Sequence, residues 1–118
     1  MRTMACEEQE LAETTKAEGP LDLGSVAFLA KTLSDENRLR ILLSVADGKK
    51  SVSRIVEEVG LSQPLVSHHL KELRLALVVK VERKGPFIYY EMADVRIGRI
   101  LGRLNELAAD LLRRRKSF

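Results

Sequence analysis

The sequence predicts a mainly α-helical chain that carries one small β-hairpin. Two observations lead to this fold class. Apolar residues recur every three or four positions through most of residues 21–118, as in helices that bury one face. One short region rich in valine, isoleucine and tyrosine interrupts that pattern. Because 118 residues suffice for a single modest core, we expect one domain over residues 21–118, preceded by a mobile acidic tail over residues 1–20.

The composition argues against a membrane protein. Hydrophobic residues make up 45% of the chain and charged residues 31%, a balance typical of folded domains in water. No stretch approaches the roughly 18 consecutive apolar residues that a membrane-spanning helix needs. Acidic residues stand where a signal peptide would have its apolar run. We therefore expect a cytoplasmic protein with no membrane partner.

The net charge of +3 is unevenly distributed. Residues 1–36 carry three basic and eight acidic side chains, a net charge of −5, whereas residues 37–118 carry seventeen basic and nine acidic ones, a net charge of +8. A polyanionic partner is therefore expected on the second part of the chain.

The first expected helix has about ten residues and a periodic apolar face, so we expect it to be a core helix. The residues of that face are Leu23, Val26, Ala27, Ala30 and Leu33.

The second expected helix spans residues 36–46. Either Ser34 or Asp35 can cap its free N–H groups, and Asp47 with Gly48 ends it. Its expected buried stripe consists of Leu39, Leu42, Leu43 and Ala46.

The third and fourth helices have the spacing of a helix-turn-helix. A short helix over residues 52–59 has an inward face of Ile55, Val56 and Val59. Gly60 supplies a turn with positive φ, and Ser62 caps the next helix, which has a proline in its first turn.

Two extended segments follow the helix-turn-helix. The runs "LVVKVER" and "FIYYEM" are rich in β-branched and aromatic residues, and Lys84-Gly85-Pro86 forms a short turn between them. A hairpin directly behind a helix-turn-helix predicts a winged helix-turn-helix, with the hairpin as the wing.

The chain ends in one long helix over residues 95–115. Its apolar stripe is larger than a terminal helix needs to dock on a small domain, so we expect two copies of the chain to dimerise through terminal helices. Packing within one chain is the alternative. The expected dimerisation residues are Ile97, Ile100, Leu101, Leu104, Leu107 and Leu111.

Both histidines of the chain lie side by side in the fourth helix, at His68 and His69. Neighbouring positions on a helix diverge, so the two rings cannot chelate one metal ion. We expect His69 to be half-buried, with a ring nitrogen bonded to a backbone group or water. His68 lies opposite the buried stripe, on a face whose side chains suit phosphates and base edges of DNA. The residues of that face are Gln63, Ser67, His68 and Lys71.

The wing offers two further cations for DNA. Arg83 and Lys84 lie at its tip, where long side chains can reach an adjacent groove or its phosphates. The basic run over residues 113–116 is read as a solvated end of the chain that complements the helix dipole.

At this point the sequence resembles the ArsR/SmtB family of dimeric bacterial winged-helix repressors. The similarity covers about residues 24–93, and two runs carry it, "LSDENRLRIL" and "LSQPLVSHHLKEL". The resemblance implies a homodimer that binds a pseudo-palindromic operator and blocks transcription until a signal releases it.

The residues of three inducer sites of that family are missing here. Many members sense metals through two cysteines that flank a valine before the recognition helix, and the corresponding stretch, "DGKKSVSRI", has Ser51 and Ser53. Serine hydroxyls are poor ligands for thiophilic ions. A second family site needs histidines that residues 94–118 lack, although Asp94 and Asp110 remain. Persulfide sensors use a pair of cysteines, and this chain has only Cys6, which we read as incidental.

One departure from the family concerns the backbone. The family often has a glycine between the recognition helix and the wing. In this sequence we expect Ala76 to occupy the position of that glycine. If that position needs positive φ, Ala76 is strained by roughly 1 kcal/mol. The alternative is that the helix ends differently.

The sequence therefore predicts a sequence-specific DNA-binding repressor that acts as a homodimer on an inverted repeat and is not a thiolate metal sensor. Its partners are double-stranded DNA and a second copy of the chain, and its inducer is unknown. A winged helix used as a protein-interaction module is the alternative. No catalytic constellation, cofactor motif or metal cluster stands out in the sequence, so we expect neither an enzyme nor a cofactor.

Overall fold

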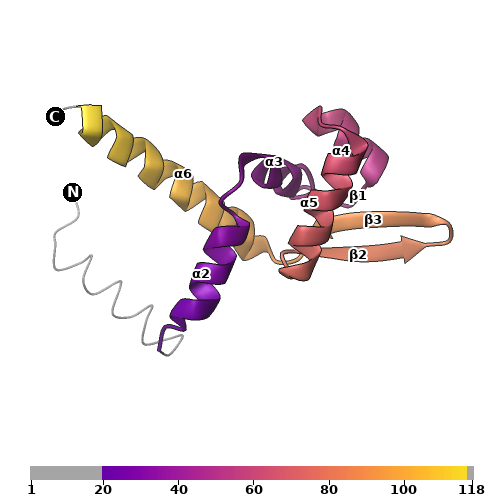
Figure 1. Cartoon of the computed structure of the whole chain (residues 1–118), viewed down its shortest axis with the longest axis horizontal. Coiled ribbons are helices and arrows are strands. Elements are labelled where there is room, and N and C mark those ends of the chain that lie inside the picture. Colours follow the sequence, from indigo (N-terminus) through magenta and orange to yellow (C-terminus); the bar gives the residue numbers. More distant parts are fainter. Residues whose placement is uncertain (1–19, 117–118) are drawn as a thin grey trace. The chain divides into compact units, whose positions relative to one another are not determined.

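The computed structural model describes residues 20–116 (Figure 1). The predicted acidic tail, with Cys6, lies outside the described residues except for Pro20. The chain divides into two compact units, residues 1–31 and residues 32–118. The first unit contributes one described helix, and the second contains the predicted helix-turn-helix and hairpin.

Helix α2, Leu23–Thr32, begins where the apolar pattern starts. Asp22 caps it, since its carboxylate accepts the backbone N–H and the hydroxyl of Ser25 at 3.2 and 2.8 Å. The prediction of a core helix is wrong, because none of the ten residues of α2 is buried. Helical spacing shows that one face of a helix is apolar, but it does not show whether that face packs against the core of the same chain. The large exposed side chains of α2 are Leu23, Val26, Phe28 and Leu29.

Helix α3, Glu36–Ser44, is capped by Asp35, whose carboxylate accepts the backbone N–H of Arg38 at 3.0 Å. The predicted buried stripe is wrong in part. Leu42 is fully buried, but its buried neighbours are Ile41 and Val45. Leu43 and Ala46 are exposed, and Leu39 is half-buried. The helix has two apolar faces, and the residue pattern does not tell which of them turns inward.

The helix-turn-helix is confirmed. Helix α4, Val52–Val59, ends at Gly60, which has a φ of 70° and closes the last turn through its N–H. Ser62 then caps helix α5, Gln63–Leu75, by accepting the backbone N–H of Leu65. The proline of the first turn of α5 costs no hydrogen bond, because the first N–H groups of a helix have no partner within it.

Helix α5 ends in a tight left-handed turn. The N–H of Val78 donates to the carbonyl of Leu73, and the N–H of Leu77 donates to that of Arg74, a Schellman arrangement. The residue with positive φ is Leu77, at 64°, whereas Ala76 has an ordinary φ of −83°. Ala76 is therefore not strained, and the helix ends in the other way that we considered, with the left-handed residue one position later.

The wing is a three-stranded antiparallel sheet in the order β1-β3-β2. Strand β2, Val79–Lys84, pairs with β3, Phe87–Met92, and the hairpin extends away from α5 (Figure 1). Its turn has two residues and begins at Gly85, whose φ is 60°, as in type II′ turns. The sequence did not predict strand β1, Lys50–Ser51, which pairs with β3, because two residues are too few for a periodic pattern.

The core lies between α3, α4, α5 and the base of the hairpin. Its fully buried side chains are Ile41, Leu42, Val45, Ile55, Val66, Leu70 and Leu73. Helix α6, Val95–Lys116, follows as predicted. Asp94 precedes it and accepts the N–H of Arg96 at 2.9 Å. Within residues 20–116, none of the helices is long and apolar enough to cross a membrane.

Candidate nucleic-acid interface

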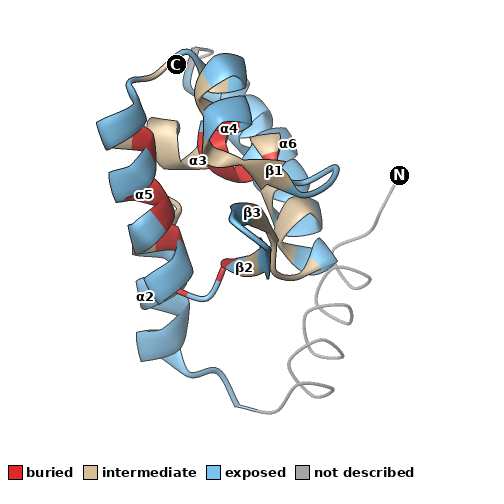
Figure 2. Cartoon of the chain, turned by 90° about the vertical axis from the view of Figure 1, so that its right-hand side faces the viewer, coloured by how far each residue is buried: buried red, intermediate tan, exposed pale blue. Residues whose placement is uncertain are grey.

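Helix α5 buries one side and exposes the other. Val66, Leu70 and Leu73 are buried, and Figure 2 shows the buried residues of α5 along one side of the helix. The four residues predicted to face DNA are all exposed, on the opposite side of the helix: Gln63, Ser67, His68 and Lys71. Amide, hydroxyl, imidazole and ammonium groups are thus available along one helical surface.

His68 is exposed but not isolated. Its Nε2 atom lies 2.7 Å from Oε1 of Glu72, one helical turn further along α5, and two thirds of the His68 side chain is exposed. The other oxygen of Glu72 accepts a hydrogen bond of 3.0 Å from Nη1 of Arg38 on α3. Nε of Arg38 donates to the carbonyl of Thr32 at 2.7 Å. A chain of polar contacts therefore links the exposed face of α5 to α3.

His69 is more deeply buried than the sequence predicted, with 8% of its side chain exposed. Its Nδ1 atom lies 3.4 Å from the same Glu72 oxygen and has no hydrogen-bond partner among residues 20–116. Of the two partners predicted for a ring nitrogen of His69, a backbone group or water, no backbone group bonds Nδ1 among these residues. The two rings differ in burial, as predicted, yet both approach one carboxylate. Sequence reasoning missed Glu72 and Arg38, although the spacings of three and four residues from the histidines to Glu72 were visible.

The wing places its two predicted cations at the end of the hairpin. Arg83 and Lys84 are exposed, and Lys84 Nζ lies 3.9 Å from Glu82 Oε1. Such an exposed contact leaves the ammonium free to exchange partners. Glu82 also pairs with Lys49, which precedes β1, and this hydrogen bond lowers the pKa of Glu82 and raises the pKa of Lys49. That pair links the segment before β1 to the middle of β2.

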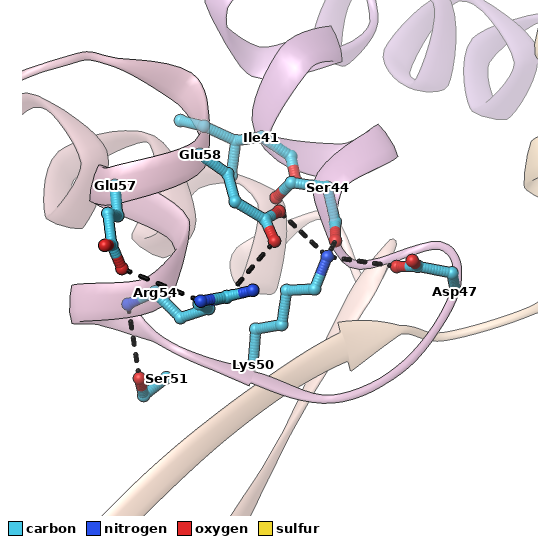
Figure 3. Close-up of polar contacts among 8 residues, drawn as sticks. All are labelled: Ile41, Ser44, Asp47, Lys50, Ser51, Arg54, Glu57 and Glu58. Atoms are coloured by element: carbon cyan, nitrogen blue, oxygen red, sulfur yellow. Dashed lines mark hydrogen bonds and ion pairs between the residues drawn. The ribbon is translucent and has the colours of Figure 1, made fainter.

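An ion-pair network lies at the start of α4, where the sequence departs from the family's thiolate site. The ammonium of Lys50 donates to the carbonyl of Ser44, to Oδ1 of Asp47 at 3.1 Å and to Oε2 of Glu58 at 2.8 Å (Figure 3). The hydrogen bonds to Glu58 and Asp47 raise the pKa of Lys50. The ammonium group of Lys50 therefore bridges α3, the following loop and α4.

Ser51 has a structural role in the same region. Its hydroxyl accepts the backbone N–H of Arg54 at 3.3 Å and so caps α4 (Figure 3). Ser53 is exposed on the first turn of that helix. No group of three or more metal-binding side chains occurs in the part of the chain that the structure describes.

The predicted dimerisation residues of α6 fall into two groups. Ile97 and Leu101 are half-buried and pack against the core of their own chain. The others are about half exposed: Ile100, Leu104, Leu107 and Leu111. The exposed Leu112 lengthens this apolar strip.

A groove of about 620 Å³ lies between α3 and α6. Leu39 and Leu43 of α3 line it, facing Leu104 and Ala108 of α6. The second apolar face of α3, which we misread as core, thus borders the exposed strip of α6. The exposed apolar surface therefore includes residues of α3 as well as residues of α6.

Comparison with known proteins gives a consistent result. Residues 35–80 match a family described as "Bacterial regulatory protein, arsR family". The chain is similar to the transcriptional repressor SdpR of Bacillus subtilis, with 40% identity over 62 residues that cover 52% of this chain and 69% of that protein. It is also similar to the HTH-type transcriptional regulator KmtR of Mycobacterium tuberculosis, with 35% identity over 76 residues, or 64% of this chain. That match spans 58% of KmtR.

The fold also matches a solved structure. The homodimeric winged helix-turn-helix DNA-binding domain of a possible ArsR-family regulator from Mycobacterium bovis superposes with a TM-score of 0.68 and 28% identity. The superposition covers 80% of this chain and 92% of that one. The helix-turn-helix and wing therefore have the fold found in that domain.

Proposed function

The chain belongs to the arsR family of bacterial regulatory proteins, and we propose that it works as a homodimeric repressor on an inverted-repeat operator. The family consists of DNA-binding transcription regulators, so the chain is not an enzyme, as the sequence predicted. The observation that carries the proposal is the exposed polar face of α5, the capped second helix of the helix-turn-helix, whose opposite side is apolar and fully buried.

In this proposal α5 is the recognition helix. It lies in the major groove, where Gln63, Ser67 and His68 contact base edges and Lys71 contacts a phosphate. Arg83 and Lys84 contact phosphates from the wing, which extends away from α5. A regulator of transcription works beside the chromosome, which supports a cytoplasmic location.

The homodimer is supported by apolar surface that one chain leaves uncovered. The strip on α6 and the groove beside it are such a surface, and apolar patches of this kind often mark a protein–protein interface. The similar Mycobacterium bovis domain is homodimeric. A two-fold axis relates two recognition helices and so requires two half-sites in opposite orientation.

We further propose that the repressor does not respond to thiophilic metals at the start of α4. Ser51 is engaged as a helix cap there, and Lys50 supplies a cation that joins Asp47 and Glu58. Zinc, cadmium and arsenite are therefore expected to leave the DNA complex intact. Release of DNA by one of these metals would contradict this part of the proposal.

Selection of bound sequences from a random DNA pool tests the main proposal. The purified protein is expected to enrich an inverted repeat at physiological salt. Ser67→Glu, which introduces a carboxylate on the exposed face of α5, should abolish enrichment, whereas Ser53→Glu, the same change on an exposed serine of α4, should not. No enrichment by the wild-type chain would favour the protein-interaction module instead.

A further inference from the structure

Glu72 stands out in the proposed interface because it contacts three side chains and is itself held from the interior. One oxygen accepts from Arg38, whose side chain is 15% exposed, and the other lies 2.7 Å from His68 and 3.4 Å from His69. Arg38 is fixed in turn by the carbonyl of Thr32. A carboxylate in an ion pair only accepts hydrogen bonds, so Glu72 offers lone pairs to His68.

The contact between His68 and Glu72 fixes where the proton of a neutral imidazole lies. A nitrogen and a carboxylate oxygen approach to 2.7 Å only when the nitrogen carries the hydrogen, since two lone pairs repel each other. Neutral His68 is then the Nε2–H tautomer, and Nδ1 has a lone pair. Nδ1 of His68 has no partner among residues 20–116.

We propose that Glu72 is a positioning residue that sets the base preference of His68, an inference that rests on the proposed DNA-binding function. As an acceptor, Nδ1 binds the exocyclic amino group of cytosine or adenine in the major groove. It rejects guanine, whose major-groove atoms are both acceptors, and cannot bind a phosphate oxygen. His68 is thereby a reader of base edges and not a phosphate clamp.

The substitution Glu72→Gln is expected to invert this preference. Arg38 offers only donors, so the amide of the variant turns its oxygen toward Arg38 and its NH₂ group toward His68. Nε2 then accepts, the proton moves to Nδ1, and the ring becomes a donor that suits guanine. Glu57→Gln is the matched control, because Glu57 pairs with Arg54 on α4, and it should change neither tautomer nor base preference.

Two measurements test the inference. Side-chain nitrogen NMR of the free, full-length protein at pH 8.5, where an imidazole is ordinarily neutral, should report the Nε2–H tautomer of His68 in the wild type and the Nδ1–H tautomer in Glu72→Gln. Selection from random DNA should then show cytosine over guanine by roughly threefold to tenfold at one position of the wild-type site. That position is identified by loss of preference in His68→Ala. Glu72→Gln should reverse the ratio.

The outcomes are separable. The Nδ1–H tautomer in the wild type, or an unchanged cytosine-to-guanine ratio in Glu72→Gln, would overturn the inference. Failure of the wild type to enrich any sequence would instead overturn the proposed function, and the tautomer measurement on the free protein would still decide the role of Glu72.

Discussion

Nη1 of Arg38 lies 3.0 Å from Oε2 of Glu72, and this ion pair joins two helices across 34 positions of sequence. Arg38 is mostly buried, whereas Glu72 is partly open to solvent. The pair therefore ties α5 to α3 at the edge of the core.

Removing Arg38 should destabilise the domain. Arg38→Ala removes the ion pair with Glu72 and the hydrogen bond to the carbonyl of Thr32, so we expect the free energy of unfolding to fall by about 2 kcal/mol in urea denaturation. Arg40→Ala is the control, because Arg40 pairs with Glu36 at an exposed position of the same helix and should cost under about 0.5 kcal/mol. Equal losses in the two variants would contradict the role assigned to Arg38.

Leu77 should be replaceable by glycine with a gain in stability. Its φ of 64° is unfavourable for a residue with a side chain, and 81% of that residue is exposed, so little apolar burial is lost. Leu77→Gly is expected to raise the free energy of unfolding by about 1 kcal/mol. Leu75→Gly, which changes a leucine that is 72% exposed and lies within the helix, should lower the free energy of unfolding by a similar amount. Destabilisation by both variants would argue against a left-handed Leu77.

The end of α5, at Ala76 and Leu77, shows which features of the backbone can be predicted from the sequence and which cannot. The pattern located α4, Gly60 and the cap at Ser62 correctly, because capping residues and left-handed glycines have local chemical signatures. It did not decide whether Ala76 has positive φ, because nothing local distinguishes two successive apolar residues at the end of a helix.

The remaining misses have a different cause. Leu43 and Ile41 both belong to apolar stripes of α3, and only tertiary packing decides that Ile41 is buried. Glu72 looks like an ordinary surface charge in the sequence. Its contact with Arg38 depends on how α3 and α5 pack, which the helical spacing of either element does not contain.

Asp94 should make the domain sensitive to strong acid. The side-chain and backbone hydrogen bonds from Arg96 lower the pKa of Asp94 from 3.8 to about 2. A carboxyl whose pKa is lowered on folding stabilises the folded state above its unfolded pKa, and this contribution disappears as the pH falls from about 3.8 through about 2. An NMR titration of the carboxyl should therefore have its midpoint near pH 2. A midpoint near 3.8 would mean that Arg96 does not hold Asp94.

The wing should contribute affinity without sequence preference. Lys84→Ala is expected to weaken binding to specific and unrelated DNA by the same factor, and to reduce the slope of log affinity against log salt by about 1. Lys80→Ala removes the same charge from the same strand farther from the turn, where Lys80 pairs with Glu91, and should leave the slope nearly unchanged. Fluorescence anisotropy over a series of salt concentrations measures both. An unaltered slope in Lys84→Ala would place the wing tip off the DNA.

Dimerisation should depend on the exposed strip of α6. Leu107→Glu puts a charge into the middle of that strip, so sedimentation equilibrium should report a monomer, or a dimer dissociating at much higher concentration. The control Leu75→Glu changes an exposed leucine outside α6 and should remain dimeric. A dimeric Leu107→Glu variant would move the interface away from this strip.

The most direct test of the central claim is the ratio of two dissociation constants at physiological salt, one for the inverted repeat enriched from a random pool and one for a scrambled DNA of the same length and composition. A sequence-specific repressor is expected to bind the repeat at least about 10³-fold more tightly. Equal affinity for the two DNAs would show that the exposed face of α5 does not read sequence, and would contradict the account.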